Sequence, residues 1–482
     1  MTAAVLVAPA AVGQIGAPAG PFDPQGTLPV EALKADLSVL WDILEEGHGG
    51  LDRYAPVAEL EKSFEAVKSG LTGPLTEIDL YGRLLPLIAA IQDGHTRLAL
   101  SEGAAAYLDA KPVHFPFALR ILGDRVHILR NLSGDRSVGE GAEVLAIDGR
   151  PMREIIEALL PLVPADAGIR TAKLRRLEDP AAFGLLYAVR FGMPEAFRAR
   201  LRSRTSGETG EVAVPGITAG DIARIPGERY PATAGRRPNY ELSFRGSTAV
   251  LTIRALGDDQ DKSRPGFPAF LAETFRSLEE KNTPGLVIDL RGNGGGFDEY
   301  GKMLFAHVAD RPFLYYWAME AKKDRYDLFR FTSETVESVA ELARPLRKNA
   351  AGRFDVVGHP NRGLQMPRSP HFAGRVAILI DGGSRSAAGE AVSAFHFYKK
   401  AVFFGEEGGA GYYGNTACLV LATLPRSRIR VSVPLVRTTM AVDGYPGDRG
   451  LVPDFPVRPT IGDLLAGRDP VLERALAFLE RK

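Results

Sequence analysis

Two serines, Ser384 and Ser386, lie where an apolar strand gives way to a helix, in the segment "DGGSRSAAGE". A serine before a helix commonly accepts a hydrogen bond from one of the first N–H groups, and a single serine is enough for this cap. The same free N–H groups, together with the macrodipole, stabilise the negative charge of an attacking hydroxyl or of an oxyanion. The pair therefore fits both a helix cap and a nucleophile, and the local sequence alone favours the cap.

A glycine-rich turn, "DLRGNGGG", follows another apolar strand about 90 residues earlier in the chain. Glycine lets the backbone turn its N–H groups toward a bound phosphate or an oxyanion. The turn lacks the Lys-Ser/Thr pair of a phosphate-binding loop, and it does not fit the G-x-G-x-x-G spacing of a dinucleotide site. We therefore interpret it as part of an oxyanion site.

Further blocks accompany these two: "DGHTRL" and, more weakly, "EEGHGGLDRY" upstream, and "FFGEEGGAGYYGN" and "DRGLVPDFPV" downstream. Together they make the chain resemble the C-terminal processing and tricorn-core-like serine peptidases, the tail-specific proteases, from about Leu28 to its end. The resemblance implies an α/β fold with a crotonase-like core and a Ser-His-acid mechanism through an acyl-enzyme, without cofactor or metal. Ser386 matches the nucleophile of this family. We expect Ala387, with Gly295 or Gly296, to supply the N–H groups of the oxyanion hole.

The base that activates the serine should be a histidine. One branch of the resembled family uses a lysine some 25 residues after the serine, but that place falls here at Gly411, and no lysine follows Lys400 except Lys482. His95, just past a helix in "QDGHTRL", matches the base of the histidine-using branch and is our choice. His48 is the reserve candidate, although its position favours a structural cation at a helix end. We expect an apparent pKa near 6.5 for the base and no turnover in His95→Ala.

The third catalytic group should be a carboxylate that orients the imidazole. Relatives place it just before the block that reads "GLVPDF" here. The commonest place, three residues before Gly450, is Gly447, so the chain departs from the pattern. Asp448 is one residue away and is our choice, with Asp443 and Glu407 as alternatives. We expect Asp448→Asn to have reduced but measurable activity.

The pattern of helices and strands predicts several regions. Alternating strands and helices after Tyr240 indicate an α/β layer structure. The segment "GAEVLAIDGRPMREII" resembles the carboxyl half of a PDZ module, with an ordinary β-hairpin and helix as the alternative. We divide the chain into residues 1–27 (a leader or clipped signal segment), 28–110 (a helical region with the catalytic histidine), 111–215 (a PDZ-like module), 216–239 (a linker), 240–460 (the peptidase core) and 461–482 (a C-terminal helix).

Composition restricts the partners. Among 482 residues, 59 are Lys or Arg and 59 are Asp or Glu, so the net charge is zero and no basic excess indicates nucleic acid. Cys418 is the single cysteine, which excludes an internal disulfide. The chain has no apolar run long enough to predict an integral membrane segment. The expected partner is a peptide or protein substrate, and the small-residue-rich start of the chain predicts an extracytoplasmic protein.

Two other functions remain open at this point. The displaced acid at Asp448 favours a catalytically weak or inactive member of the same superfamily that binds a peptide or a lipid. The presence of Ser386, His95 and the glycine turn argues against it. An acyl-CoA enzyme with the same oxyanion cradle is more distant, because it would not need Ser386.

Overall fold

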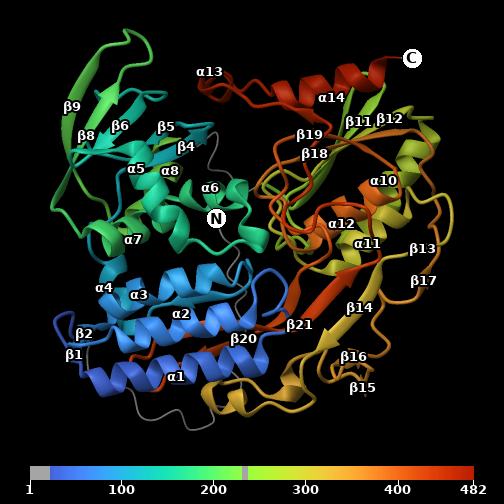
Figure 1. Ribbon diagram of the computed structural model, residues 1–482. Coiled ribbons are helices and arrows are strands. Elements are labelled where there is room, and N and C mark those ends of the chain that lie inside the picture. The colour runs from blue at the N-terminus through green and yellow to red at the C-terminus, as the bar shows by residue number, and fades with distance from the viewer. Residues whose placement is uncertain (1–21, 231–236, 482) are drawn as a thin grey trace.

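The computed structural model describes residues 22–230 and 237–481, so most of the expected leader lies outside the described residues. The chain forms a mixed α/β structure in which three large sheets surround a common centre (Figure 1). In Figure 1 the N-terminal helices lie at the bottom left, the sheet that contains β4 to β9 at the upper left, and the mainly parallel sheet at the upper right.

The mainly parallel sheet has the order β10-β11-β12-β18-β19-β22. Only β10 runs antiparallel to its neighbour. Its strands are β10 (Tyr240–Arg245), β11 (Thr248–Ile253), β12 (Gly285–Asp289), β18 (Arg375–Ile380), β19 (Val402–Gly405) and β22 (Phe455–Pro456). The alternation of strands and helices expected after Tyr240 is thereby confirmed for this sheet.

Helices cover both faces of this sheet, which explains why its strands are continuous apolar runs. Leu286 and Ile288 point to one face, which packs on α10 (Phe267–Glu280), α11 (Asp298–Ala306) and α12 (Ala387–Phe397). Val287, between them, points to the other face, which packs on α14 (Pro470–Glu480). The expected single C-terminal helix is in fact two, because α13 (Ile461–Leu465) precedes α14.

A second sheet packs against the N-terminal helices. Its order is β15-β16-β14-β21-β20, and β3 pairs with β21. The long strands β20 (Thr416–Thr423) and β21 (Arg430–Met440) come from the region expected to form the core, yet they share one apolar cluster with the N-terminal helices. The N-terminal region comprises β1 (Thr27–Leu28), α1 (Val30–Gly47), α2 (Val57–Ser69), β2 (Leu75–Thr76), α3 (Glu77–Ala90), β3 (Arg97–Ala99) and α4 (Glu102–Asp109).

The remaining elements of this part are short. They are β13 (Phe313–Leu314), β14 (Tyr316–Ala321), η3 (Asp327–Phe331), η4 (Val336–Ser338), β15 (Leu346–Lys348), β16 (Phe354–Val356) and β17 (Leu364–Gln365). β13 and β17 pair with each other.

The third sheet, β4-β5-β6-β8-β9, is antiparallel and occupies the region expected to be PDZ-like. A hairpin turn at Gly123 and Asp124 joins β4 to β5. The elements are β4 (Phe117–Leu122), β5 (Arg125–Asn131), β6 (Glu143–Ile147), β7 (Arg150–Pro151), α5 (Met152–Leu159), η1 (Leu160–Leu162), η2 (Asp166–Gly168), α6 (Arg170–Leu177), α7 (Pro180–Phe191), β8 (Ala196–Arg202) and β9 (Thr209–Pro215).

The expected linker 216–239 is wrong for its first half, which forms helix α8 (Ala219–Arg229). Thr218 and Asp221 form a capping box at its start. The helix packs on the third sheet through Ile225, and the Arg229 side chain donates to the carbonyl of Ser133 at 2.9 Å. In the part of the chain that the structure describes, no helix combines the length and the apolar character needed to cross a bilayer.

Candidate active site

The two serines at the end of β18 have different roles. The Ser384 hydroxyl is buried, donates to the carbonyl of Leu290 at 2.8 Å and accepts the N–H of Asp381 at 3.1 Å, so it ties the turn to the end of β12. Ser386 occupies the N-cap position of α12, but its side chain makes no cap hydrogen bond. The cap interpretation is therefore wrong for Ser386.

The backbone of Ser386 is strained. Its φ of 53° and ψ of −134° lie outside the regions that a residue with a side chain normally adopts. Such strain is retained where the surrounding structure holds it and it is common at functional sites. In this conformation the side chain makes no cap hydrogen bond, and its hydroxyl lies against His95.

His95 contacts Ser386 directly. Nε2 of the imidazole lies 3.1 Å from Oγ of Ser386, within hydrogen-bond distance. For Nε2 to accept the serine proton, the neutral ring must carry its own proton on Nδ1. Nδ1 is buried and has no hydrogen-bond partner among the described residues. The structure thus brings together two of the three predicted catalytic residues.

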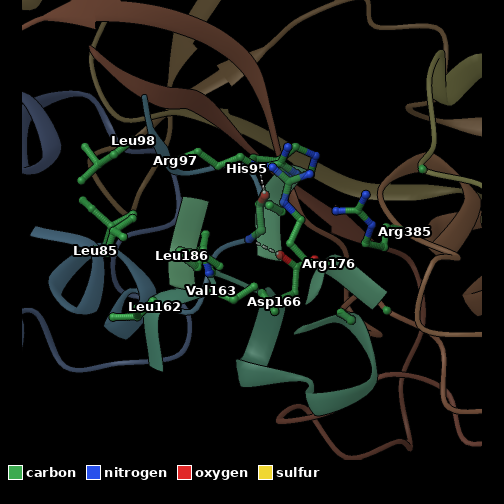
Figure 2. Close-up of a pocket in the computed structure, with 18 of the residues that line it drawn as sticks. Leu85, His95, Arg97, Leu98, Leu162, Val163, Asp166, Arg176, Leu186 and Arg385 are labelled. Atoms are coloured by element: carbon green, nitrogen blue, oxygen red, sulfur yellow. Dashed lines mark hydrogen bonds between the residues drawn. The ribbon is translucent and has the colours of Figure 1, made fainter. Parts of the chain in front are cut away.

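Two carboxylates that the sequence analysis did not select lie beside His95. One oxygen each of Asp93 and Asp166 and one ring nitrogen of His95 are all within 4.8 Å of one another. Asp166 belongs to η2, and its Oδ1 accepts the N–H of Gly94 at 2.7 Å, which fixes it against the histidine loop (Figure 2). Burial and the charge of Asp93 raise the pKa of Asp166, while His95 acts in the opposite direction.

Asp93 organises the loop that carries His95. Its Oδ1 accepts the N–H groups of His95 at 2.8 Å and of Thr96 at 2.9 Å, and its Oδ2 accepts the hydroxyl of Thr416 in β20 at 2.7 Å. Although burial opposes its ionisation, the neighbouring imidazoles of His48 and His95 and these hydrogen bonds lower the pKa of Asp93 to about 2. By donor type and spacing, Asp93, His95 and Asp166 would also suit a cation, but most of the lone pairs of Asp93 are already used.

His48, the reserve base, is hydrogen-bonded to the loop that carries His95. Its Nδ1 accepts the N–H of Gly50 at 3.0 Å, so its Nε2 carries a proton and donates to the hydroxyl of Thr96 at 2.7 Å. The ring is fully buried, and burial lowers its pKa. The expectation of a cationic helix end is therefore wrong, and His48 is a neutral structural residue.

Asp448 does not reach His95. Its side chain is exposed, and no hydrogen bond or ion pair joins it to the imidazole. The loop around it lies at the surface, where the next residue, Arg449, pairs with Glu407 at 3.2 Å. Asp443 is exposed as well. In the described parts of the chain, no hydrogen bond or ion pair joins any of the three carboxylates considered from the sequence to the imidazole, whereas Asp93 and Asp166 lie beside it.

The glycine turn lies directly against Ser386. A Cβ on Gly295, whose φ is +99°, would lie 2.6 Å from Cβ of Ser386, so only glycine fits. However, the N–H of Gly295 donates to Oδ1 of Asn293 at 2.9 Å, which leaves it unavailable to an oxyanion. Gly294 lines the same pocket as Ser386. Ala387 is the first residue of α12, where the N–H groups have no partner within the helix.

Of these two acids, Asp93 has a recognisable signal in the sequence. Asp93 precedes His95 by two residues, a spacing at which an aspartate commonly accepts backbone N–H groups. Asp166 had none, because it lies 71 residues after His95 in an irregular turn.

Residues 248–457 match the model of Peptidase family S41. The carboxy-terminal processing protease CtpB of Bacillus subtilis is 31% identical over 104 residues, which span 19% of this chain and 22% of the relative. The structure of mature CPAF complexed with lactacystin superposes with a TM-score of 0.62 at 15% identity, covering 94% of this chain and 98% of that chain. Another structure of mature CPAF gives 0.62 at 14% identity, with 94% and 97% covered. At such identities the likeness to these structures shows the fold alone.

Proposed function

Because residues 248–457 match the model of Peptidase family S41, we propose that this chain is a serine peptidase of that family that cleaves peptide bonds through an acyl-enzyme. The observation that carries the proposal is the 3.1 Å contact between Nε2 of His95 and Oγ of Ser386 at the N-terminus of α12. A hydroxyl next to an imidazole and to unpaired N–H groups is the arrangement that acyl transfer needs.

In the proposed reaction Ser386 Oγ attacks the carbonyl carbon of the scissile bond while His95 Nε2 takes its proton. The N–H of Ala387, with that of Gly294 or Gly296, binds the oxyanion. His95 then gives the proton to the leaving amine, which departs and leaves an ester on Ser386. Water, deprotonated by His95, attacks the ester and releases the acid.

We propose Asp166 as the acid that orients His95, in place of Asp448. Asp93 is held by at least four hydrogen bonds, from the His95 and Thr96 backbone and from the Thr96 and Thr416 hydroxyls. Among the described residues, Asp166 accepts one close bond, from the N–H of Gly94, and its second oxygen is 3.4 Å from the N–H of Gly411. It therefore has the capacity to accept the Nδ1 proton of His95 and to stabilise the imidazolium. The absence of an acid from its usual place in the sequence had favoured an inactive protein that only binds its ligand. With Asp166 beside His95, this argument no longer applies.

The finer features of the fold are part of the proposal. A parallel sheet with the nucleophile at a strand-to-helix turn supports a crotonase-like core over residues 240–460. The antiparallel sheet with α8 beside it supports a PDZ-like module over residues 111–229, which extends the boundary expected from the sequence. His95 would then belong to a separate helical region, 28–110.

Labelling with a fluorophosphonate probe followed by peptide mapping tests the chemistry. We expect a single adduct on Ser386, no adduct in Ser386→Ala, and an adduct that forms far more slowly in His95→Ala. Turnover of a peptide substrate should fall on the order of a million-fold in Ser386→Ala. A folded wild-type protein that is labelled at another residue, or not at all, would show that the proposal is wrong.

We also propose an extracytoplasmic location, which rests on the small-residue-rich N-terminal sequence. Fractionation of cells that express the native chain should recover it outside the cytoplasm, with its first residues removed. Recovery of the intact chain in the cytoplasmic fraction would contradict this location.

A further inference from the structure

The glycine turn and the turn that carries Ser386 follow neighbouring strands. β12 and β18 pair in parallel, and Leu290, just after β12, donates its N–H to the carbonyl of Leu379 in β18 at 3.0 Å. The two turns therefore leave the same edge of the sheet side by side. Because the oxyanion hole proposed above takes one N–H from each turn, their separation decides whether both donors reach the same oxygen atom.

One carboxylate joins the two turns. Oδ1 of Asp381, the first residue after β18, accepts the N–H of Gly292 in the glycine turn and the N–H of Gly383 in its own turn, each at 2.8 Å. The backbones of the two turns also meet at this point. A Cβ on Gly383 would lie 2.7 Å from Cα of Gly292, so a side chain there would push the turns apart. A single oxygen of Asp381 thus spans a contact that is too close for a side chain.

The other oxygen of Asp381 is paired with helix α6. Oδ2 lies 3.4 Å from Nε of Arg175, and both side chains are only 14% exposed. Arg175 also pairs with Glu178 at 2.7 Å and with Glu406, so it keeps two acidic partners if Asp381 is made neutral. The two oxygens therefore have separate roles, one as an acceptor between the turns and one in an ion pair with α6.

Two further hydrogen bonds join the same turns. The N–H of Arg385 donates to the carbonyl of Asn293 at 2.9 Å, and the Ser384 hydroxyl donates to the carbonyl of Leu290 at 2.8 Å. Neither bond uses the carboxylate of Asp381. Its removal should therefore leave the turns attached to each other but allow them to separate at Gly292 and Gly383.

We propose that Asp381 is a positioning residue whose Oδ1 holds the glycine turn at the distance from Ser386 at which N–H groups of both turns bind one oxyanion. The inference rests on the proposed peptidase function and goes beyond it. Loss of this link should weaken the binding of the transition state, in which the oxyanion carries the charge, and hardly affect the binding of the intact peptide. A displacement of about 1 Å is sufficient to reduce a rate by about a hundredfold.

Two substitutions at Asp381 separate the roles of its oxygens. Asp381→Asn keeps an amide oxygen that can accept both N–H groups but removes the charge beside Arg175, whereas Asp381→Ala removes both. In Asp381→Ala we expect kcat to fall by about tenfold to a hundredfold, with KM within about twofold of the wild-type value. The rate at which the fluorophosphonate labels Ser386 should fall in proportion. Asp381→Asn should retain at least about a third of the wild-type kcat, because the acceptor between the turns remains.

Asp148→Ala is a matched control in the third sheet. Oδ1 of Asp148 accepts the N–H of Arg198 at 2.9 Å and Oδ2 accepts the hydroxyl of Tyr187 at 2.7 Å, so this carboxylate also joins separate segments. Its removal should lower the midpoint of thermal unfolding and leave kcat unchanged. All kinetics are measured at a temperature at which circular dichroism shows each variant to be folded.

Hydrogen exchange separates this proposal from the function on which it rests. The amides of Gly292 and Gly383 should exchange slowly in the wild type and in Asp381→Asn, and at least about tenfold faster in Asp381→Ala. Equal kcat in the wild type and Asp381→Ala, or a loss that appears in KM alone, overturns the proposal. An equally large loss of kcat in Asp381→Asn also overturns it, in favour of the ion pair with Arg175. If the wild type neither reacts with the fluorophosphonate nor turns over, but the exchange rates follow this pattern, the peptidase function fails and the link between the turns stands.

Discussion

The protonation of His95 should determine how kcat/KM falls at low pH. As a general base it must be neutral, and burial lowers its pKa below 6.5 although Asp93 and Asp166 act in the opposite direction. The rate should therefore rise with pH and reach its plateau at a lower pH than an unperturbed imidazole would allow, contrary to the value near 6.5 expected from the sequence. The measurement is kcat/KM as a function of pH for a peptide without titratable groups. An inflection well above 6.5 would contradict the burial argument.

The assignment of Asp166 makes a paired prediction with Asp448. Asp166→Asn removes the carboxylate that we propose to hold the useful tautomer and to stabilise the imidazolium, so we expect kcat to fall by about a hundredfold to ten-thousandfold. Because a negative charge beside His95 is lost, the acid limb should also move to lower pH. Asp448→Asn, at an exposed site, should retain near wild-type activity.

Kinetics of both variants, after circular dichroism has shown them to be folded, provide the check. If Asp448→Asn loses activity and Asp166→Asn keeps it, then Asp448, as expected from the sequence, is the acid that orients His95.

At the scale of elements, the close approach of the glycine turn to α12 should be essential. In Gly295→Ala the new methyl group would meet Ser386 and the residue would be held at a positive φ, so we expect activity to fall at least a hundredfold. Gly246→Ala, also at positive φ but in open space, shares the backbone strain without the clash. Activity measured on both variants at a temperature where both are folded separates the effects. Equal losses would show that strain alone, and not the contact with Ser386, is responsible.

Elements with local signals were predictable, whereas contacts across the fold were not. The strand, the turn with Ser386 and the helix after it are consecutive in the chain, so their pattern could be read directly. Asp166 reaches His95 only because the third sheet docks beside the N-terminal helices, and no local pattern encodes that docking. Helix α8 was missed because Pro226 and Gly227 suggested a linker, although the Thr218 and Asp221 spacing of a capping box preceded them.

At the scale of the molecule, the site is assembled from all three sheets. Ser386 follows a strand of the parallel sheet, His95 precedes β3 of the second sheet, and Asp166 lies in the segment that joins α5 to α6 beside the third. The relative placement of the three parts therefore decides whether the catalytic groups meet. We therefore expect buried polar groups at the contacts between these three parts to affect the free energy of unfolding of the whole protein.

Glu390 is such a group, and it lies between the core and the second sheet. On α12, its Oε2 lies 2.6 Å from the hydroxyl of Tyr316 in β14, and its Oε1 accepts the hydroxyl of Thr438 in β21 at 3.1 Å. Tyr316 also lies 2.8 Å from Asp298, and because one hydroxyl proton cannot serve two ionised carboxylates, this arrangement requires a further shared proton. Burial and the charge of Asp298 raise the pKa of Glu390 to about 8, so Glu390 carries that proton at neutral pH.

This proton makes the stability of the protein depend on pH. Between the unfolded pKa of 4.5 and the folded value of about 8, the folded chain holds a proton that the unfolded chain has lost. The free energy of unfolding should therefore decrease as pH rises through this interval, by up to about 1.4 kcal/mol per pH unit from this group. The buried histidines, whose pKa is lowered, act in the opposite sense, and their contribution continues above pH 6.5 because unfolded imidazoles are still partly protonated there. The contribution of Glu390 is therefore the difference between two slopes. In Glu390→Gln, a neutral amide that cannot ionise, the slope between pH 6.5 and 8 should be more positive than in the wild type, whereas Glu273→Gln, at an exposed site, should keep the wild-type slope. Midpoints of urea unfolding at several pH values give the slopes, and parallel wild-type and Glu390→Gln curves would mean that Glu390 is already ionised in the folded protein.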